Sequence, residues 1–404
     1  MKKNILTTFV VIFLFVAPNL QIKGNVFSSV KLFEKYNNEI SGLRGVLSKL
    51  SFYTPDMGRP DIHLNDGRKV SIDFTFDEDL QKFSNKILRR NGSDFVSIVV
   101  IDNNTGKILT VAEKDRHNSL KGKSITFDSS HPAASIIKVI TTANLLKLPG
   151  IDLDSSFSYF GRSTTLYKHQ LVDRPNKSWK RWRTLRKAFA TSNNPIFGVA
   201  AIRQSNAMGL YKTAESFGFN EKVLPFPSLE PSNFGMPVDQ YHLAQLASGL
   251  NKETTLSPIH GALIASIIAN EGQRITPSLI KSITIDKKKF SPMNGASEEV
   301  LHYDLAKEIH NVMEYTVKYG TPRRSFFSKK KSVLRDLIIG GKTGTMSGGK
   351  PFGQRDWFIA FAKRANMAQD DKGISICVMT INRKRWYVKS SVVARKVIEY
   401  YFRN

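Results

Sequence analysis

The sequence of 404 residues contains a single cysteine, Cys377. One thiol cannot form a disulfide within the chain, and a lone cysteine has no companions for a thiolate metal site. Its neighbours, residues 374–379, are mostly apolar and predict a buried strand. The eight histidines show no metal-ligand spacing either. A metal or thiol mechanism is therefore disfavoured, and we expect no cofactor.

Acidic residues are also few, with 34 Asp plus Glu against 60 Lys plus Arg and a formal net charge of +26. Such a charge favours contact with an anionic membrane surface or an anionic wall polymer. The basic residues are spread along the chain, and no nucleic-acid-binding motif accompanies them, so nucleic acid is not an expected partner. An ordinary solvated surface is the alternative reading of most of this charge.

The chain begins with Lys2 and Lys3, followed by uncharged and mostly apolar residues 5–17. This run has the form of a secretory signal and is shorter than the roughly 20 residues of a spanning helix. The triplet at residues 17–19 is not the small-x-small pattern of a good cleavage site, so cleavage and retention as an anchor both stay open. We expect residues 1–24 to be a signal peptide or N-terminal membrane anchor. The rest of the chain would be extracytoplasmic, in the periplasm or on the outer face of the cytoplasmic membrane.

The next segment, residues 25–68, is polar and ends in several Pro and Gly breakers, which is typical of a short stalk or lead-in. From residue 69 onwards we expect one domain, residues 69–404. Strand patterns lie at both of its ends, in residues 96–111, 357–362 and 374–381, whereas helical periodicity fills its middle, in residues 134–148, 241–250 and 258–269. This order predicts an α+β fold in which both ends of the domain share an antiparallel sheet around an α-rich insertion.

Ser135 and Lys138 stand three residues apart at the start of the apolar helix predicted at residues 134–148. Residues at this spacing share a helix face, so the Lys138 amine can reach the Ser135 hydroxyl. A serine becomes a good nucleophile when a neighbour takes its proton, and lysine can do so when burial or positive charge lowers its pKa. The pattern alone is weak, because an ordinary helix start would also fit. Four other serines precede a lysine by three residues: Ser28, Ser278, Ser328 and Ser347.

A second polar group, Ser192, Asn193 and Asn194, is followed by Pro195. The Ser192 hydroxyl could relay a proton between a lysine and a leaving amine, and the Asn194 amide could hold a substrate carbonyl. The alternative is a helix N-cap, which Ser and Asn favour.

The third group is Gly340-Gly341-Lys342-Thr343-Gly344-Thr345, which follows an apolar strand pattern. Glycines allow a substrate backbone to lie alongside a strand, and the Lys342, Thr343 and Thr345 side chains suit a terminal carboxylate. A phosphate-binding loop is excluded, because Asp336 stands where that motif requires glycine.

The three groups occur in the order Ser-x-x-Lys, Ser-x-Asn and Lys-Thr-Gly, which together resemble the signature of the penicillin-interacting serine enzymes. The similarity covers most of residues 69–404 and is to the transpeptidase domain of the penicillin-binding proteins. Further segments that carry it are residues 74–81, 104–109, 256–258, 268–272, 319–321 and 356–359. Ala134 and Glu271 depart from the family, which usually has glycine at both positions.

This resemblance implies a β-lactamase/transpeptidase-like fold, with a five-stranded antiparallel sheet flanked by helices and an α-rich subdomain. The implied catalytic residues are Ser135, Lys138, Ser192, Asn194 and Lys342, and the implied substrate-binding residues are Thr343, Gly344 and Thr345. The implied substrates are peptidoglycan stem peptides, with β-lactam antibiotics as covalent inhibitors. We expect a monofunctional serine D,D-transpeptidase that cross-links stem peptides through a Ser135 acyl-enzyme.

Three other functions would use the same groups. A D,D-carboxypeptidase or endopeptidase would pass the acyl group to water. A β-lactamase would need a deacylating base, and Glu230 stands near the position of such a glutamate, although Ser228 and Phe234 replace its expected Arg and Asn neighbours. A β-lactam sensor would need a transducing segment, and none is evident beyond the first 20 residues.

Overall fold

A computed structural model of the chain describes residues 62–63, 67–121, 123–172, 179–224, 229–290, 297–327, 333–366 and 371–403. The expectations for residues 1–24, and for most of residues 25–68, lie outside these described residues. Within them, no helix combines the length and the apolar character needed to cross a membrane. The same residues contain no cluster of three His, Cys, Asp or Glu side chains arranged to hold a metal ion.

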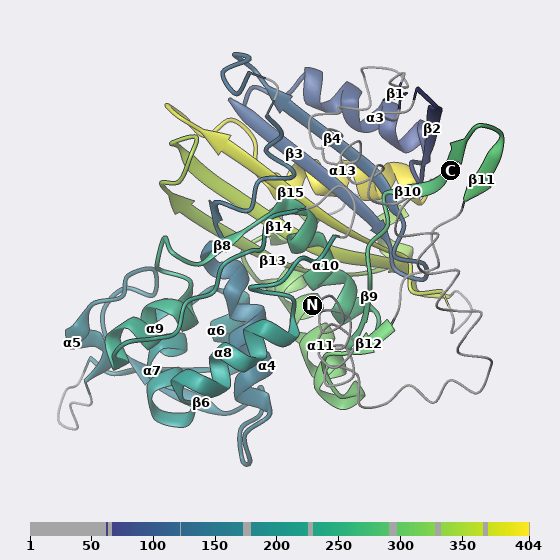
Figure 1. Ribbon diagram of the computed structural model, residues 1–404. Helices are drawn as coiled ribbons and strands as arrows, with labels where there is room; N and C mark the ends of the chain where they lie inside the picture. The colour runs from purple at the N-terminus through teal and green to yellow at the C-terminus, as the bar shows by residue number, and fades with distance from the viewer. Residues whose placement is uncertain are drawn as a thin grey trace, which may run out of the picture. The chain divides into compact units, whose positions relative to one another are not determined.

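A five-stranded antiparallel sheet with the strand order β13-β14-β15-β3-β4 forms the centre of the domain (Figure 1). Its strands are β3 (Phe95–Asp102), β4 (Ile108–Asp115), β13 (Leu337–Ser347), β14 (Gln354–Arg364) and β15 (Ile374–Asn382). These strands confirm the predicted hairpin and the predicted C-terminal strands. Because β15 pairs with β3, the two ends of the domain meet in the middle of the sheet.

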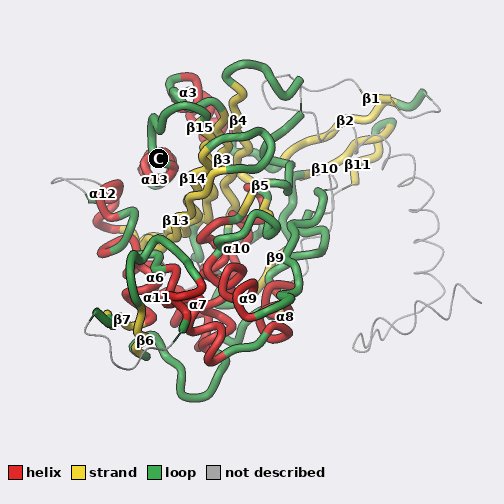
Figure 2. The backbone as a smooth tube through the Cα atoms, turned by 90° about the vertical axis from the view of Figure 1, so that its left-hand side faces the viewer, coloured by secondary structure: helices red, strands yellow, loops and turns green. Residues whose placement is uncertain are grey.

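The central strands separate two hydrophobic cores, since successive side chains of a strand point to opposite faces. On β3, Ile98 faces a core that includes α3 (Glu78–Arg89) and α13 (Ser390–Tyr401). The next residue, Val99, faces the larger core, which includes α10 (Pro258–Ala269). Figures 1 and 2 show α3 and α13 on one side of the strands and α10 on the other. The predicted α+β class, with helices flanking the sheet, is thus confirmed.

The bounds of α10 agree with the predicted helix because its ends carry clear signals. Ser257 is the N-cap and its hydroxyl accepts a hydrogen bond from His260 N, while Pro258 occupies the first turn. Every residue of α10 is buried, so this helix is enclosed by the fold rather than amphipathic.

The predicted α-rich subdomain is built mainly from the middle of the chain. Its elements are η3 (Ala134–Ile137), α4 (Lys138–Leu146), β6 (Ser156–Tyr159), α5 (Lys168–Leu171), β7 (Arg181–Thr184), α6 (Leu185–Ala190), α7 (Asn194–Gln204), α8 (Ala207–Ser216) and α9 (Gln240–Ser248). The helix predicted at 134–148 begins with a 3₁₀ turn, and the helix predicted at 241–250 is α9.

Short strands outside the main sheet were mostly not predicted, because two to six residues carry little periodicity. Besides β6 and β7, they are β1 (Ile62–His63), β2 (Lys69–Phe74), β5 (His131–Pro132), β8 (Thr255–Leu256), β9 (Gln273–Ile275), β10 (Ile280–Ile285), β11 (Lys288–Phe290) and β12 (Ser297–Glu299). The remaining elements are α11 (Tyr303–Tyr319), α12 (Arg323–Phe326) and η4 (Val333–Asp336).

The turn after α10 explains one departure from the family pattern. Glu271 has a left-handed backbone, with φ of 57°, and such a conformation favours glycine. Its carboxylate lies 2.8 Å from Lys372 Nζ, just before β15. The backbone of Glu271 is thus strained at a position that favours glycine. Its side chain forms an ion pair that links this turn to the segment before β15.

Gly261 allows α10 to approach β15 closely. A Cβ at this position would lie 2.9 Å from Sγ of the buried Cys377 and 3.3 Å from Ile359 Cγ2. We expect Gly261→Val to lower the free energy of unfolding by about 1–3 kcal/mol, because the packed core has no room for the added methyl groups. Denaturant-induced unfolding of the purified protein measures this change.

The matched control is Gly235→Val, since a Cβ there would meet no atom within 4 Å. This control should change the free energy of unfolding by no more than about 0.5 kcal/mol. Adding Cys377→Ala to Gly261→Val should recover part of the lost stability. If Gly261→Val is as stable as the parent protein, α10 is not in close contact with β15 at this position.

Candidate active site

Ser135 lies in the 3₁₀ turn η3, which runs directly into α4 at Lys138. A 3₁₀ helix has three residues per turn, so positions i and i+3 eclipse each other. Ser135 therefore lies over Lys138, and Lys138 Nζ donates to Ser135 Oγ at 2.9 Å. Ser135 is partly exposed, whereas the flanking Ala134 and Ile136 are buried. The predicted contact between the serine hydroxyl and the lysine amine is present.

The Lys138 amine is buried and is held by three oxygen atoms. Besides Ser135 Oγ, it donates to Asn194 Oδ1 at 2.7 Å and to the Ser248 carbonyl oxygen at 2.5 Å. Burial, and then the charge of Lys342, hold the pKa of Lys138 well below its usual value. A neutral lysine amine can accept a proton from the hydroxyl beside it, which is the property that a serine nucleophile requires.

The residues of the second polar group make different contacts. Asn193 is the N-cap of α7, and its side chain accepts from Ile196 N at 3.0 Å. This is the capping role that we considered as the alternative, and it falls to the middle residue. Asn194 uses its oxygen for Lys138 and one N–H for the Thr164 carbonyl, at 2.8 Å. The Asn194 side chain thus links Lys138 to the segment that precedes α5.

Lys342 on β13 connects the second and third groups. Its amine donates to Ser192 Oγ at 3.0 Å and to the Thr343 carbonyl oxygen at 2.9 Å. The Lys342 side chain is fully buried, and burial lowers its pKa to about 7. Near neutral pH this amine can therefore either donate or accept a proton, with the Ser192 hydroxyl beside it.

The glycines of β13 pack closely against neighbouring segments, and their predicted place beside a substrate backbone stays a prediction. A Cβ at Gly340 would overlap the ring of Phe361, and one at Gly341 would lie 2.6 Å from Phe358 Cζ. At Gly344 it would lie 3.3 Å from Ile136 N and 3.4 Å from the Ala133 carbonyl oxygen. Gly340 and Gly341 thus admit aromatic rings of β14, and Gly344 brings β13 against the turn that carries Ser135.

The threonine hydroxyls of the third group differ in their contacts and exposure. Thr343 is partly exposed and its hydroxyl lies 2.5 Å from the hydroxyl of Thr321. Thr345 is exposed. Thr321 was not among our predicted site residues, although its segment contributed to the family resemblance. Because Thr321 N also donates to the Ala190 carbonyl, this residue ties β13 to the turn before Ser192.

The Ser248 carbonyl and Gly249 also help to form the site around Lys138, and neither could be predicted from a sequence motif. Gly249 ends α9 with a left-handed φ of 69°, and a Cβ there would overlap the Ala134 carbonyl oxygen. The C-terminus of α9 is thus pressed against the nucleophile turn, which positions the Ser248 carbonyl beside the Lys138 amine.

Glu230, the residue considered as a deacylating base, is exposed. Its main-chain carbonyl accepts a hydrogen bond from Ser129 Oγ at 2.5 Å. Ser129 thus holds the main chain at Glu230, while the Glu230 side chain faces solvent.

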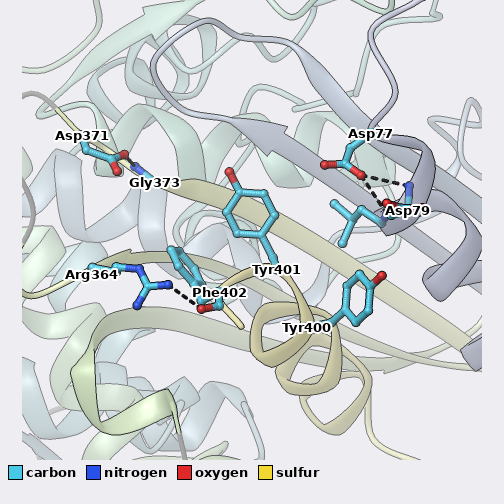
Figure 3. Close-up of a pocket in the computed structure, with 9 residues that line it drawn as sticks. Asp77, Asp79, Arg364, Asp371, Gly373, Tyr400, Tyr401 and Phe402 are labelled. Atoms are coloured by element: carbon cyan, nitrogen blue, oxygen red, sulfur yellow. Dashed lines mark hydrogen bonds between the residues drawn. The ribbon is translucent and has the colours of Figure 1, made fainter. Parts of the chain in front are cut away.

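A cavity of about 560 Å³ lies on the α13 side of the sheet and contains none of the predicted site residues (Figure 3). Two of its three carboxylates, those of Asp77 and Asp371, already serve the local structure. Asp77 caps α3 by accepting from Asp79 N and Leu80 N, and Asp371 accepts from Gly373 N. The Arg364 guanidinium donates to the Phe402 carbonyl. These polar groups of the cavity lining therefore have structural roles at the ends of α3, α13 and β14.

The chain belongs to the family of penicillin-binding protein transpeptidase domains, whose sequence pattern matches residues 96–396. Among curated proteins it is similar to the peptidoglycan D,D-transpeptidase PbpA of Mycobacterium tuberculosis. The two are 27% identical over 247 residues, which are 58% of this chain and 47% of PbpA. The match thus spans about half the length of that relative.

Solved structures share the fold of this chain. The crystal structure of PBPA from Mycobacterium tuberculosis has a TM-score of 0.64 at 22% identity and covers 83% of this chain and 82% of its own. The penicillin G acyl-enzyme complex of the same protein has a TM-score of 0.61 at 20% identity, with coverages of 82% and 81%. The D,D-transpeptidase domain of a peptidoglycan glycosyltransferase from Eggerthella lenta has a TM-score of 0.67 at 20% identity, with coverages of 88% and 90%.

Ala134, the other departure from a usual glycine, offers a test of strain beside the nucleophile. Its φ is 50°, whereas the adjacent Ala133 is right-handed with φ of −70°. Both are buried, so replacement by glycine removes one buried methyl group in each case. We expect Ala134→Gly to be more stable than Ala133→Gly by about 1–2 kcal/mol, because alanine is strained only in the left-handed conformation. Thermal and denaturant unfolding of the two variants measure the difference; equal stabilities would contradict a strained Ala134.

Proposed function

We propose that this protein is a serine D,D-transpeptidase that cross-links peptidoglycan stem peptides through an acyl-enzyme on Ser135. The observation that carries the proposal is the buried Lys138 amine, 2.9 Å from Ser135 Oγ and held by two further acceptors. Burial and the Lys342 charge lower its pKa, which favours the neutral amine. The neutral amine would donate its two protons to Asn194 and Ser248, and its lone pair would take the Ser135 proton. The hydroxyl oxygen then attacks the carbonyl between the last two residues of a stem peptide.

The negative charge that develops on that carbonyl oxygen needs hydrogen-bond donors nearby. The backbone N–H groups of Ser135 and Thr345 are the proposed donors. The close approach of Gly344 to Ile136 N supports this pairing, since it brings β13 beside the nucleophile turn.

Departure of the last D-alanine requires a proton on its amine. The pair formed by Ser192 Oγ and Lys342 Nζ, 3.0 Å apart, is the proposed source, and the pKa of Lys342 near 7 suits it to give up a proton at neutral pH. The Thr343 and Thr345 hydroxyls, with Gly344 between them, would hold the carboxylate of the departing residue.

An amine of a second stem peptide would then attack the ester carbonyl, and the bond from the acyl group to Ser135 Oγ would break. Lys138 would return its proton to Ser135, and the proton of the attacking amine would pass to the pair of Ser192 and Lys342. The similar PbpA is a peptidoglycan D,D-transpeptidase, which supports an amine acceptor rather than water. The penicillin G acyl-enzyme complex of PBPA supports β-lactams as covalent inhibitors of this chain, with Ser135 as the proposed site. A D,D-carboxypeptidase or endopeptidase would share every step up to the acyl-enzyme.

We also propose the setting in which this reaction occurs. Residues 1–24 would export or anchor the chain, residues 25–68 would form a short stalk, and residues 69–404 would act extracytoplasmically. The net charge of +26 supports contact with anionic lipids or wall polymers.

The nucleophile assignment is tested by covalent labelling. Intact-protein mass spectrometry after incubation with benzylpenicillin should show one penicilloyl adduct, and Ser135→Ala should show none. Lys138→Ala should acylate roughly 10²- to 10⁴-fold more slowly, because the hydroxyl loses its base. The matched control is Ser278→Ala, which removes another serine that precedes a lysine by three residues and should label like the parent. Labelling that persists in Ser135→Ala would exclude Ser135 as the nucleophile.

The fate of the adduct separates a transpeptidase from a β-lactamase. Since Glu230 is exposed, no buried base is proposed to activate water, and the penicilloyl ester should last for minutes to hours. Glu230→Gln should leave this lifetime almost unchanged in a time course of adduct decay. Turnover of penicillin on the order of once per second, abolished in Glu230→Gln, would instead establish the β-lactamase function.

A further inference from the structure

Asp356 on β14 lies directly opposite Thr345, the exposed last residue of the third motif. The Thr345 hydroxyl is 3.3 Å from Asp356 Oδ1. The other carboxylate oxygen, Oδ2, accepts from Ser390 N at 2.7 Å, at the start of α13. Asp356 is only 4% exposed, so this carboxyl group connects a buried helix terminus to a hydroxyl on the surface of the proposed site.

The protonation state of Asp356 decides which way the Thr345 hydroxyl points. An ionised carboxylate can only accept hydrogen bonds, so the hydrogen bond between the two groups then requires Thr345 to donate its single proton inward to Oδ1. The outer side of the hydroxyl would present lone pairs, which cannot bind the carboxylate of a ligand.

Protonation reverses this hydrogen bond. Because Oδ2 already accepts from Ser390 N, the added proton belongs on Oδ1, the oxygen that faces Thr345. Oδ1 then donates to Thr345 Oγ1, and the Thr345 proton is available to a ligand. The outward O–H would form a charge-assisted hydrogen bond with an ionised carboxylate.

The surroundings of Asp356 permit this change of state. From α13, Lys389 faces the carboxyl with a positive charge, and Ser390 supplies its N–H. Across the neighbouring strands, β13 contributes Thr345 and β15 contributes Thr380, which are both neutral. Burial is the largest effect on the pKa of Asp356 and raises it to about 6, against the lowering effect of the hydrogen bonds and of Lys389.

We propose that Asp356 is a positioning residue that sets the direction of the Thr345 O–H bond, so that Thr345 recognises a ligand carboxylate when Asp356 is protonated and recognises it poorly when Asp356 is ionised. This inference rests on the proposed function, because it assigns the carboxylate of a stem peptide or β-lactam to Thr345. It adds a residue outside the three motifs to the substrate-binding machinery.

The experiment compares two probes, benzylpenicillin and its uncharged methyl ester, in acylation of the full-length chain between pH 5 and 8. The measured quantity is the ratio of the second-order acylation rate constants for the acid and the ester. Effects of Lys138 on nucleophile activation act on both probes and cancel in this ratio. As the pH falls from 7.5 to 5, the parent ratio should rise by up to roughly tenfold, the value of one charge-assisted hydrogen bond.

Asp356→Asn should keep the ratio near the parent's low-pH value, because an amide N–H can donate to Thr345 at any pH while its oxygen accepts from Ser390 N. The pH dependence that persists in this variant belongs to Lys342 and the other charged groups, so the difference from the parent isolates Asp356. If Asp356→Asn retains the full pH dependence of the parent, the inference is wrong.

Two Thr345 variants test the same point without altering the buried carboxyl. Thr345→Ser keeps a hydroxyl and should keep the pH dependence of the ratio. Thr345→Val should lower the ratio of acid to ester rate constants and abolish the share of its pH dependence that comes from Asp356. Equal ratios for these two variants at every pH would also overturn the inference. Failure of the proposed function is distinguishable, since Ser135→Ala would then still be acylated by both probes.

Discussion

The amine of Lys138 is the group on which the rest of the proposed site depends. A lysine amine in a protein core is costly unless it is neutral or fully hydrogen-bonded. Here Ser135, Asn194 and Ser248 surround it with oxygen atoms from three different segments, and the Phe197 ring lies 5.4 Å from Nζ. The three segments are η3, α7 and α9, which all belong to the α-rich subdomain. The geometry around the amine therefore follows from the packing of that subdomain.

Several residues at the site adopt conformations that their own sequence does not favour. Ala134 and Ser192 both have a left-handed backbone, with φ of 50° and 57°, and Lys342 is a second fully buried lysine. Such features persist only where the surrounding structure holds them in place. The close contacts at Gly249 and Gly344 supply that support, since both allow neighbouring segments to press against the turn that bears Ser135. The left-handed residues and the buried lysine thus lower local stability, and the contacts around them hold the polar groups of the site in a fixed arrangement.

The sequence predicted the elements whose signals are local, and it missed those that depend on distant contacts. The helix at 258–269 has an N-cap, a proline and a long apolar run, and its bounds were predicted correctly. The spacing of Ser135 and Lys138 predicted their contact, although the turn is 3₁₀ rather than α-helical. By contrast, Thr321 and the Ser248 carbonyl reach the site through tertiary packing that no motif encodes. Glycine is needed at positions 340 and 341 because the rings of Phe361 and Phe358 pack against them. Those rings come from β14, so the local sequence does not show this need.

The strand order of the main sheet has a consequence for the sequence of events in folding. β15, residues 374–382, is inserted between β14 and β3, and all nine of its residues are buried. Until these residues are available, β3 has an unpaired edge rich in Val and Ile, and neither hydrophobic core can close. Edges of this kind pair readily with other chains. The domain can therefore complete its fold only after residues 374–382 have been synthesised, and a chain shortened before residue 374 would lose the middle of its sheet rather than an edge.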